Sequence, residues 1–225
     1  MILCTSILSL ESVLRSFPVS RLRRSTLVAD VLSVKAFPKN LFLSVLPPTV
    51  DIVCLHPMFG PESGKGSWAG LPLVYDRVRV GSEPAREKRC AALLKAFEVE
   101  GCRMVDMPCE EHDKLAASSQ FITHTVGRML GAMDLPNTPI NTRGYESLLS
   151  LVDNTTKDSF DLYYGLFMYN ASSTDELARM EAAFDGVKRQ LFDQLHGLVR
   201  ARILHTPPDE GRPASPVPEV GRLPG

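Results

Sequence analysis

The sequence lacks several features that mark particular classes of protein. It contains no apolar run of the ~18 residues that suggest a membrane-spanning helix. Its formal net charge of -1 at pH 7 leaves no basic excess of the kind that nucleic-acid-binding proteins carry. The amino terminus has neither the basic segment of a secretory signal nor a Ser/Arg-rich transit peptide. We therefore expect no membrane span and no nucleic-acid partner.

The five cysteines also lack a recognisable pattern. They are scattered along the chain, and no two of them are spaced C-x-x-C, so the sequence predicts neither a disulfide framework nor a metal site. Hydrophobic residues make up 44% of the chain and charged residues 23%, which is typical of an ordinary globular protein. A chain of 225 residues with this composition is long enough to bury a substantial core.

The first half of the chain alternates short apolar segments with amphipathic ones. Segments rich in Val, Ile and Leu at 2–6, 26–31 and 51–55 predict strands that are covered on both faces. Further strands are expected at 73–78 and 103–107. Helices are expected at 8–17, between Pro38 and Pro47, and at 84–100. Because helical segments separate the first strands, the sequence predicts the α/β class, with a partial Rossmann-like parallel sheet rather than hairpins.

From Glu110 onwards the pattern is purely helical, with helices expected at 110–133, 144–153, 158–169 and 174–204. The last helix carries apolar residues at three- and four-residue steps, which predicts a core or dimer face. We expect an incomplete nucleotide-binding domain at 1–108 and a helical substrate and dimerisation domain at 109–205. The proline- and glycine-rich tail at 206–225 is predicted to be disordered, because it has too little apolar surface to offset its ordering entropy.

Polar side chains follow three of the predicted strands. Thr5 and Ser6 end the first, Ser33 and Lys35 follow the second, and His56 ends the third. Ligands bind beyond the carboxyl ends of the strands in open α/β sheets, so we expect these side chains to face one crevice. A histidine there is a candidate general base. The alternatives are a loop histidine beside a proline at position 56 and ordinary turn chemistry at Ser33.

The helix expected from residue 110 has one face of small and polar residues. Its members are Ala116, Gln120, His124, Gly127 and Gly131. Gln120 and His124 lie one turn apart, so they can contact the same ligand, although a helix–helix contact around a buried histidine explains the pattern equally well. The acidic residues Glu110, Glu111 and Asp113 suit the first turn of a helix, and the segment lacks the H-E-x-x-H spacing of a zinc site.

Four motifs resemble one known family, the plant-type arogenate/prephenate dehydrogenases. They are D-V-L-S-V-K at 30–35, H-P-M-F-G-P-E-S-G at 56–64, E-H-D-K-L-A-A-S-S-Q-F-I-T-H-T-V-G-R at 111–128 and D-S-F-D-L-Y-Y-G-L-F-M-Y-N at 158–170. The resemblance extends from about residue 1 to residue 204. It implies oxidative decarboxylation of arogenate to tyrosine with NADP as cofactor, in a homodimer located in the chloroplast.

The resemblance also implies roles for single residues. His56 matches the base that takes the substrate's hydroxyl proton, and Ser33 the residue that hydrogen-bonds this hydroxyl. Gln120, His124 and Thr142 match substrate-pocket positions.

Asp158 lies where arogenate-using members are acidic. Arogenate carries an ammonium where prephenate carries a keto group, so a carboxylate favours arogenate. Alternatively, Asp158 only caps the helix that follows it.

The sequence departs from this family in one respect. Family members hold the cofactor's pyrophosphate on a G-x-G-x-x-G turn. No such spacing occurs among the 225 residues, and the glycines at 60, 64, 66 and 70 match the substrate-side loop instead. We expect an N-terminally truncated member with an exposed sheet edge, in which Thr5, Ser6 and Lys35 contact the cofactor. The alternatives are prephenate dehydrogenase activity, a non-catalytic remnant that dimerises or binds tyrosine or arogenate, and another β-hydroxyacid-type dehydrogenase.

Overall fold

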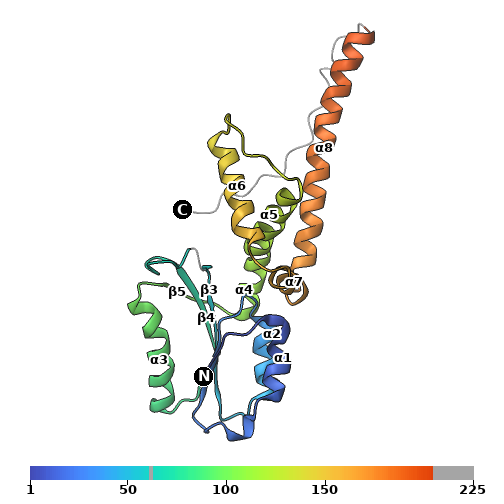
Figure 1. The fold of residues 1–225 in the computed structure, drawn as a ribbon. Helices are drawn as coiled ribbons and strands as arrows, with labels where there is room; N and C mark the ends of the chain where they lie inside the picture. Colours follow the sequence, from blue (N-terminus) through green and yellow to red (C-terminus); the bar gives the residue numbers. More distant parts are fainter. Residues whose placement is uncertain (61–62, 205–225) are drawn as a thin grey trace. The chain divides into compact units, whose positions relative to one another are not determined.

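The computed structural model describes residues 1–60 and 63–204 (Figure 1). The chain divides into two compact units, residues 1–177 and 178–225. The described part of the second unit consists of the greater part of one long helix, α8 (Ser173–Leu204). None of the described helices is both long and apolar enough to cross a membrane. The predicted tail at 206–225 lies outside the described residues, and the domain boundary proposed near residue 108 stays a prediction.

The first unit is built on a five-stranded sheet whose strands are ordered as they occur in the sequence. Its strands are β1 (Ile2–Leu3), β2 (Leu27–Asp30), β3 (Asp51–Pro57), β4 (Pro72–Arg79) and β5 (Arg103–Asp106). β1, β2 and β3 are parallel, and so are β4 and β5. The predicted α/β class and partial Rossmann-like sheet are confirmed.

One pair of strands departs from the parallel arrangement, because β3 and β4 run antiparallel. The described residues of the loop between them contain no helix. A parallel neighbour needs a crossover connection, whereas a loop without one returns the chain in the opposite direction. The glycine-rich segment that follows His56 therefore turns the chain back alongside β3.

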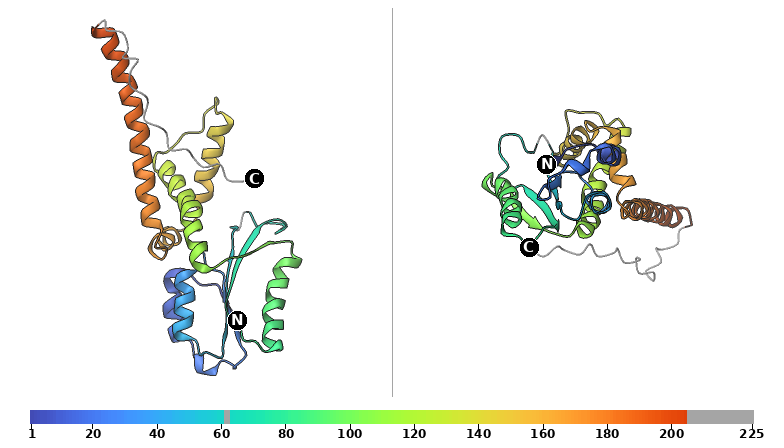
Figure 2. Two further views of the ribbon diagram at one scale, coloured as in Figure 1. Left: turned by 180° about the vertical axis from the view of Figure 1, so that it is seen from behind. Right: turned by 90° about the horizontal axis from the view of Figure 1, so that it is seen from below.

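Helices cover both faces of the sheet. α1 (Ile7–Ser16) and α2 (Ala36–Val45) lie on one face and α3 (Pro84–Val99) on the other, as the two side views show (Figures 1 and 2). Successive strand residues alternate between the two cores. Val28 and Ile52 pack with α1 and α2, whereas Leu27, Ala29 and Val53 pack with α3. Each large apolar side chain buried in this way contributes ~1.5–3 kcal/mol, which explains why the strand sequences are apolar on both faces.

Among the described residues, β1 forms one edge of the sheet and pairs with β2. The amino group of Met1 donates to the carbonyl of Leu27 at 2.8 Å, and Ile2 is 46% exposed. β1 is thus an edge strand of the sheet as described.

The remaining helices of the first unit follow β5. They are α4 (Cys109–Ala116), a π-helical turn η2 (Ala117–Phe121), α5 (Ile122–Ala132), α6 (Arg143–Thr156) and α7 (Phe160–Met168). Small residues on α5 allow α6 to approach closely. A Cβ at Gly127 would lie 2.0 Å from Thr155 Oγ1, and one at Gly131 would lie 3.0 Å from Thr156 Cγ2. These two glycines therefore serve a helix–helix contact, one of the alternatives left open by the sequence.

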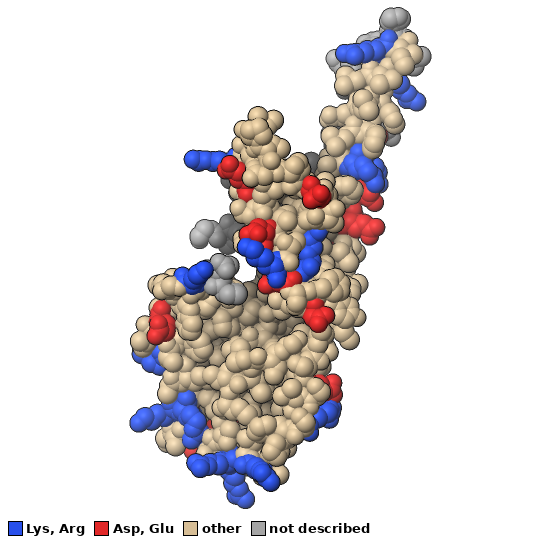
Figure 3. Space-filling model, in the orientation of Figure 1, with Lys and Arg blue, Asp and Glu red and all other residues tan. Residues whose placement is uncertain are grey.

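The charges visible on the molecular surface are of both signs. Figure 3 shows basic and acidic side chains at the margins of a largely uncharged area over the sheet-bearing part of the first unit. This distribution agrees with the formal net charge of -1.

Candidate functional site

The carboxyl end of β2 carries a buried ion pair. Asp30 is fully buried and Lys35 is 2% exposed. The Lys35 ammonium forms an ion pair with Asp30 and donates to the carbonyl of Leu55 on β3 at 2.6 Å. Asp30 also accepts the backbone N–H of Leu32 at 3.2 Å. The pair ties the ends of β2 and β3 together and fixes the start of the segment that contains Ser33.

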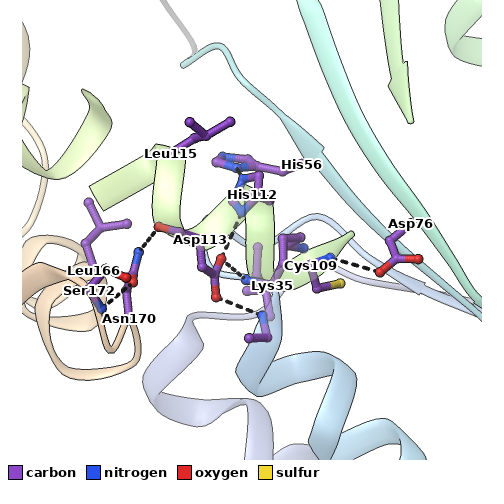
Figure 4. A network of polar contacts seen from close by, with 12 residues as sticks. Lys35, His56, Asp76, Cys109, His112, Asp113, Leu115, Leu166, Asn170 and Ser172 are labelled. Carbon is purple, nitrogen blue, oxygen red and sulfur yellow. Dashed lines mark hydrogen bonds and ion pairs between the residues drawn. The ribbon is translucent and has the colours of Figure 1, made fainter. Parts of the chain in front are cut away.

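At the end of β3, His56 begins a chain of three buried polar side chains (Figure 4). Its Nδ1 lies 2.7 Å from Nε2 of His112. Nδ1 of His112 lies 2.8 Å from Oδ1 of Asp113. His56 is 3% exposed, His112 is 2% exposed and Asp113 is 6% exposed. Strand β3 supplies the first of these side chains and helix α4 supplies the other two.

Asp113 is held in place by the start of helix α2. Its two carboxylate oxygens accept the backbone N–H groups of Lys35 and Ala36, each at 2.8 Å. Lys35 is the N-cap of α2, and its own side chain makes no capping bond. A carboxylate from a distant helix therefore satisfies two of the N–H groups that a helix start leaves unpaired, and it suits the positive end of the helix dipole.

Helix α4 is fixed at both its ends. The N–H of Cys109 donates to Asp76 of β4 at 2.9 Å. The side-chain amide of Asn170 donates to the carbonyl of Asp113 at 2.7 Å, and Asn170 is itself 4% exposed. These contacts, drawn in Figure 4, fix the helix that presents His112 to His56.

The surroundings of His56 favour its neutral form. Burial lowers the pKa of His56 well below its usual value, and the nearby His112 and Lys35 lower it further. A neutral imidazole has one nitrogen with a free lone pair, which is what a general base needs.

The serines at the strand ends lie around a separate small cavity of about 200 Å³. Ser6, Ser33 and Ser159 all line it, together with apolar residues of α1 and α7. Ser6 also caps α1 by accepting the N–H of Leu8 at 3.3 Å. The hydroxyl of Thr5 is buried and has no hydrogen-bond partner among the described residues. Ser33 and His56, both described, make no hydrogen bond to each other, and the predicted contact of Ser33 with the substrate's hydroxyl stays a prediction.

The prediction that Lys35 contacts a cofactor does not fit its position. The ammonium is buried and already bound to Asp30 and to the carbonyl of Leu55. Removing it from these partners would leave Asp30 buried without its counter-charge, at a cost of ~3–5 kcal/mol. Its place in the structure is that of an internal ion pair.

Helix α4 continues through the π-helical turn η2 into α5. The hydroxyls of Ser118 and Ser119 donate to the carbonyl of Leu115 at 3.2 and 2.7 Å. These side-chain hydrogen bonds supplement the altered backbone hydrogen bonds of the π-helical turn. In an uninterrupted α-helix, which rotates by ~100° per residue, side chains twelve residues apart such as His112 and His124 point ~120° apart around the helix axis. A π-turn takes up one extra residue, which reduces this angle to ~20°. The π-turn thus alters which residues before and after it share a side of the helix.

Gln120 and His124 both have unsatisfied polar atoms. Oε1 of Gln120 and Nδ1 of His124 are buried and make no hydrogen bond among the described residues. Burial lowers the pKa of His124, while the carboxylate of Asp158 opposes this shift. Nδ1 of His124 and Oδ2 of Asp158 are 3.8 Å apart.

Asp158 is not the helix cap that one interpretation of the sequence proposed. Ser159 caps α7 by accepting the N–H of Leu162 at 3.2 Å. The side chain of Asp158 faces His124 instead, so the capping alternative is wrong. Thr142, by contrast, is the cap of α6 and accepts the N–H of Tyr145 at 3.3 Å. Its predicted contact with substrate stays a prediction.

Arg128 positions the start of α7. It donates to the carbonyls of Asp158 and Ser159 at 2.7 and 3.2 Å, and its guanidinium lies over the rings of Tyr163 and Phe160, at 5.1 and 5.9 Å from their centroids. Cation–π contacts of this kind add stability.

Three residues of the site are not singled out by the sequence. The local pattern places His112 and Asp113 in a charged first turn of a helix, and it shows Arg128 only as the end of a motif. The available signal is spacing, because Arg128 lies one turn beyond His124. No local pattern indicates that His112 meets a residue 56 positions away.

Comparison with known proteins confirms the resemblance to the plant enzymes. The model of the family "TYRAAT1-like, C-terminal domain" matches residues 129–203. Arogenate dehydrogenase 2, chloroplastic, from Arabidopsis thaliana is 60% identical over 202 residues, which are 90% of this chain and 56% of the relative. Arogenate dehydrogenase 1, chloroplastic, from the same plant is 60% identical over 195 residues, 87% of this chain and 30% of the relative. The chain thus spans about half the length of one of these relatives and about a third of the other.

A solved structure supports the fold. The prephenate dehydrogenase of A. aeolicus, in complex with hydroxyphenyl propionate and NAD+, matches 91% of this chain and 72% of its own with a TM-score of 0.63 at 15% identity. At that identity the likeness concerns the fold alone.

Proposed function

We propose that this chain, which is similar to plant arogenate dehydrogenases over nine tenths of its length, carries the substrate half of an NADP-dependent enzyme that oxidatively decarboxylates arogenate to tyrosine. The observation that carries the proposal is the position of His56, which is buried at the carboxyl end of β3 and contacts His112. A general base there is what the removal of a hydroxyl proton requires. Prephenate is the alternative substrate.

In this proposal, Nε2 of His56 takes the proton from the ring hydroxyl as the carbon–hydrogen bond at the same carbon breaks. A bound nicotinamide would supply the acceptor for the hydride. The ring carboxylate then leaves as carbon dioxide, its bonding electrons complete the aromatic ring, and the proton on His56 returns to the phenolate oxygen. Ser33 would hydrogen-bond the reacting hydroxyl, although its side chain lines the cavity shared with Ser6 and makes no bond to His56.

The residues at the ends of β1 and β2 fit the nicotinamide end of such a cofactor. The unpartnered hydroxyl of Thr5 offers one polar group there, and the small cavity lined by Ser6 and Ser33 offers two more. The pyrophosphate end has no matching G-x-G-x-x-G turn within the 225 residues. The assignment of NADP rather than NAD rests on the resemblance to the plant enzymes alone.

The polar side chains of Gln120, His124 and Asp158 on the helical side would read the substrate's amino group. Asp158 faces His124 and supplies a carboxylate, and Gln120 has an unsatisfied oxygen. A charge-assisted hydrogen bond to the ammonium of arogenate would select it over the keto group of prephenate. The names of the relatives favour a chloroplast location.

The second unit supports a homodimer. Five apolar residues at three- and four-residue steps along α8 are each more than half exposed: Phe184, Val187, Leu191, Leu195 and Leu198. A continuous apolar stripe on a helix is the kind of surface that pairs with an equivalent one.

Direct titration with NADP tests the enzymatic proposal. We expect binding in the micromolar range, tighter than that of NAD, and NADPH formation when arogenate is added. The variant His56→Asn should retain binding and lose at least ~100-fold in kcat, since general bases contribute 10²–10⁴-fold. A chain that binds arogenate but neither dinucleotide would instead be the non-catalytic form, and the proposal would fail.

A further inference from the structure

The chain of hydrogen bonds behind His56 has a direction that chemistry determines. A carboxylate only accepts hydrogen bonds, and that of Asp113 already accepts two backbone N–H groups at 2.8 Å. Nδ1 of His112, which lies 2.8 Å from this carboxylate, must therefore donate a proton to it. The other ring nitrogen of His112, Nε2, is the atom that faces His56.

If His112 is neutral, its Nε2 carries a lone pair and accepts from Nδ1–H of His56. The remaining nitrogen of His56, Nε2, then has no proton and is free to accept one. If His112 were instead doubly protonated, it would donate to His56, and Nε2 of His56 would carry the proton and be useless as a base. The identity of the donor between these two rings thus decides whether His56 can act.

We propose that His112 and Asp113 are positioning residues that hold His56 in its Nδ1–H tautomer and stabilise it when its Nε2 takes up the substrate's proton. The proposal rests on the base assigned to His56 under the proposed function. When Nε2 gains the proton, the imidazolium of His56 keeps donating to His112, whose own proton stays on Nδ1 and continues to point at Asp113. No proton has to move from His112 to Asp113. The negative charge of the Asp113 carboxylate, at the other end of this hydrogen-bonded series, compensates the positive charge on His56.

The position of Asp113 suits this role. It is 6% exposed, so water does not compete for the proton of His112. Two N–H groups at the start of α2 hold the carboxylate in place, and Asn170 fixes the helix on which it lies. Lys35 is the nearby cation, and its ammonium is already paired with Asp30. The carboxylate that compensates the charge on His56 is therefore Asp113 rather than Asp30.

The tautomer of His56 can be measured without any enzymatic activity. Nitrogen-15 NMR of the imidazole side chains in the full chain should show a protonated Nδ1 and an unprotonated Nε2 for His56. Signals are assigned by comparing His56→Asn, His112→Gln and His196→Gln. His196 lies on the exposed part of α8, so His196→Gln is the control that should leave the signals of His56 unchanged.

Two substitutions at position 112 separate positioning from simple packing. In His112→Gln, the amide oxygen takes the place of Nε2 and accepts from His56, so the Nδ1–H tautomer should persist. In His112→Phe the acceptor is lost, and the two tautomers of His56 should become mixed. Circular dichroism and thermal unfolding show whether each variant folds. If the His112→Phe variant fails to fold, the tautomer of His56 in the wild-type and His112→Gln spectra still tests the positioning role.

Activity provides the second measurement. In protein that forms NADPH, kcat of His112→Phe should fall ~100-fold while KM changes less than ~2-fold, and His112→Gln should recover most of the loss. A wild-type spectrum with the proton on Nε2 of His56 would overturn the inference even if His56→Asn abolishes activity. Conversely, the expected tautomer in a chain without activity would leave the positioning role standing and sink the proposed function.

Discussion

The imidazole of His124 and the carboxylate of Asp158 face each other, with Nδ1 and Oδ2 3.8 Å apart. Arg128, one turn along the same helix, holds the carbonyl of Asp158 at 2.7 Å. The carboxylate is therefore directed towards the helix that bears Gln120 and His124 rather than towards its own helix. This arrangement makes Asp158 the residue with which to test substrate choice.

Replacing Asp158 by Asn should weaken the binding of arogenate ~10- to 100-fold, because a hydrogen bond to a charged group is worth ~1.5–3 kcal/mol. Binding of prephenate should change little. Calorimetric titration of both compounds measures the difference, with Asp161→Asn as the control, an exposed acid in the first turn of α7. Equal losses for the two compounds would show that Asp158 does not read the amino group.

Stability should fall on acidification through the range in which free histidines titrate. The pKa values of His56 and His124 are lowered in the folded protein, in both cases chiefly by burial. Below their unfolded value of ~6.5, the unfolded chain binds protons that the folded one does not, so the free energy of unfolding decreases by up to ~1.4 kcal/mol per pH unit for each group. Above that value the contribution is fully present.

Urea unfolding at several pH values between about 5.5 and 7.5 checks this prediction. His56→Asn removes one of the two groups, so the slope of stability against pH should become shallower even if the variant is less stable throughout. A stability that does not change over this range would contradict the neutral, buried state of His56.

The stability of the fold should depend strongly on the ion pair between Lys35 and Asp30 at the end of β2. Lys35→Met leaves the carboxylate of Asp30 fully buried without its counter-charge, and we expect a loss of ~3–5 kcal/mol in the free energy of unfolding. Lys39→Met is the matched control, because its pair with Glu110 is partly exposed and such pairs contribute ~0–1 kcal/mol. Chemical denaturation of both variants measures the two losses. Similar losses in the two variants would refute the claim that burial makes the Lys35–Asp30 pair more important for stability than the exposed pair.

The apolar stripe of α8 should govern assembly. Leu191→Glu places a charge at the centre of the stripe, where Leu191 is 66% exposed, and should convert a dimer to a monomer in sedimentation velocity. Asp193→Lys changes charge on the opposite side of the helix and should leave the dimer intact. A wild-type chain that sediments as a monomer at all concentrations would exclude the proposed homodimer.

Much of the fold followed from local sequence because it depends on periodicity. The strands of the first half are apolar on both faces, since helices cover the sheet on both sides. The helices after residue 108 likewise begin and end within a few residues of their predicted positions. The direction of β4 was not predictable in this way, because an apolar strand has the same pattern whichever way it runs.

The sequence by itself determined the alternation of strands and helices, the position of His56 at a strand end, and the resemblance carried by four motifs. Only the tertiary structure decided what His56 contacts. His112 and Asp113 lie in a segment that reads locally as an acidic helix start, and their partners lie 56 and 78 residues away. Contacts over such separations arise from the packing of α4 against the ends of β3 and α2, and no local pattern of residues encodes which side chains meet there.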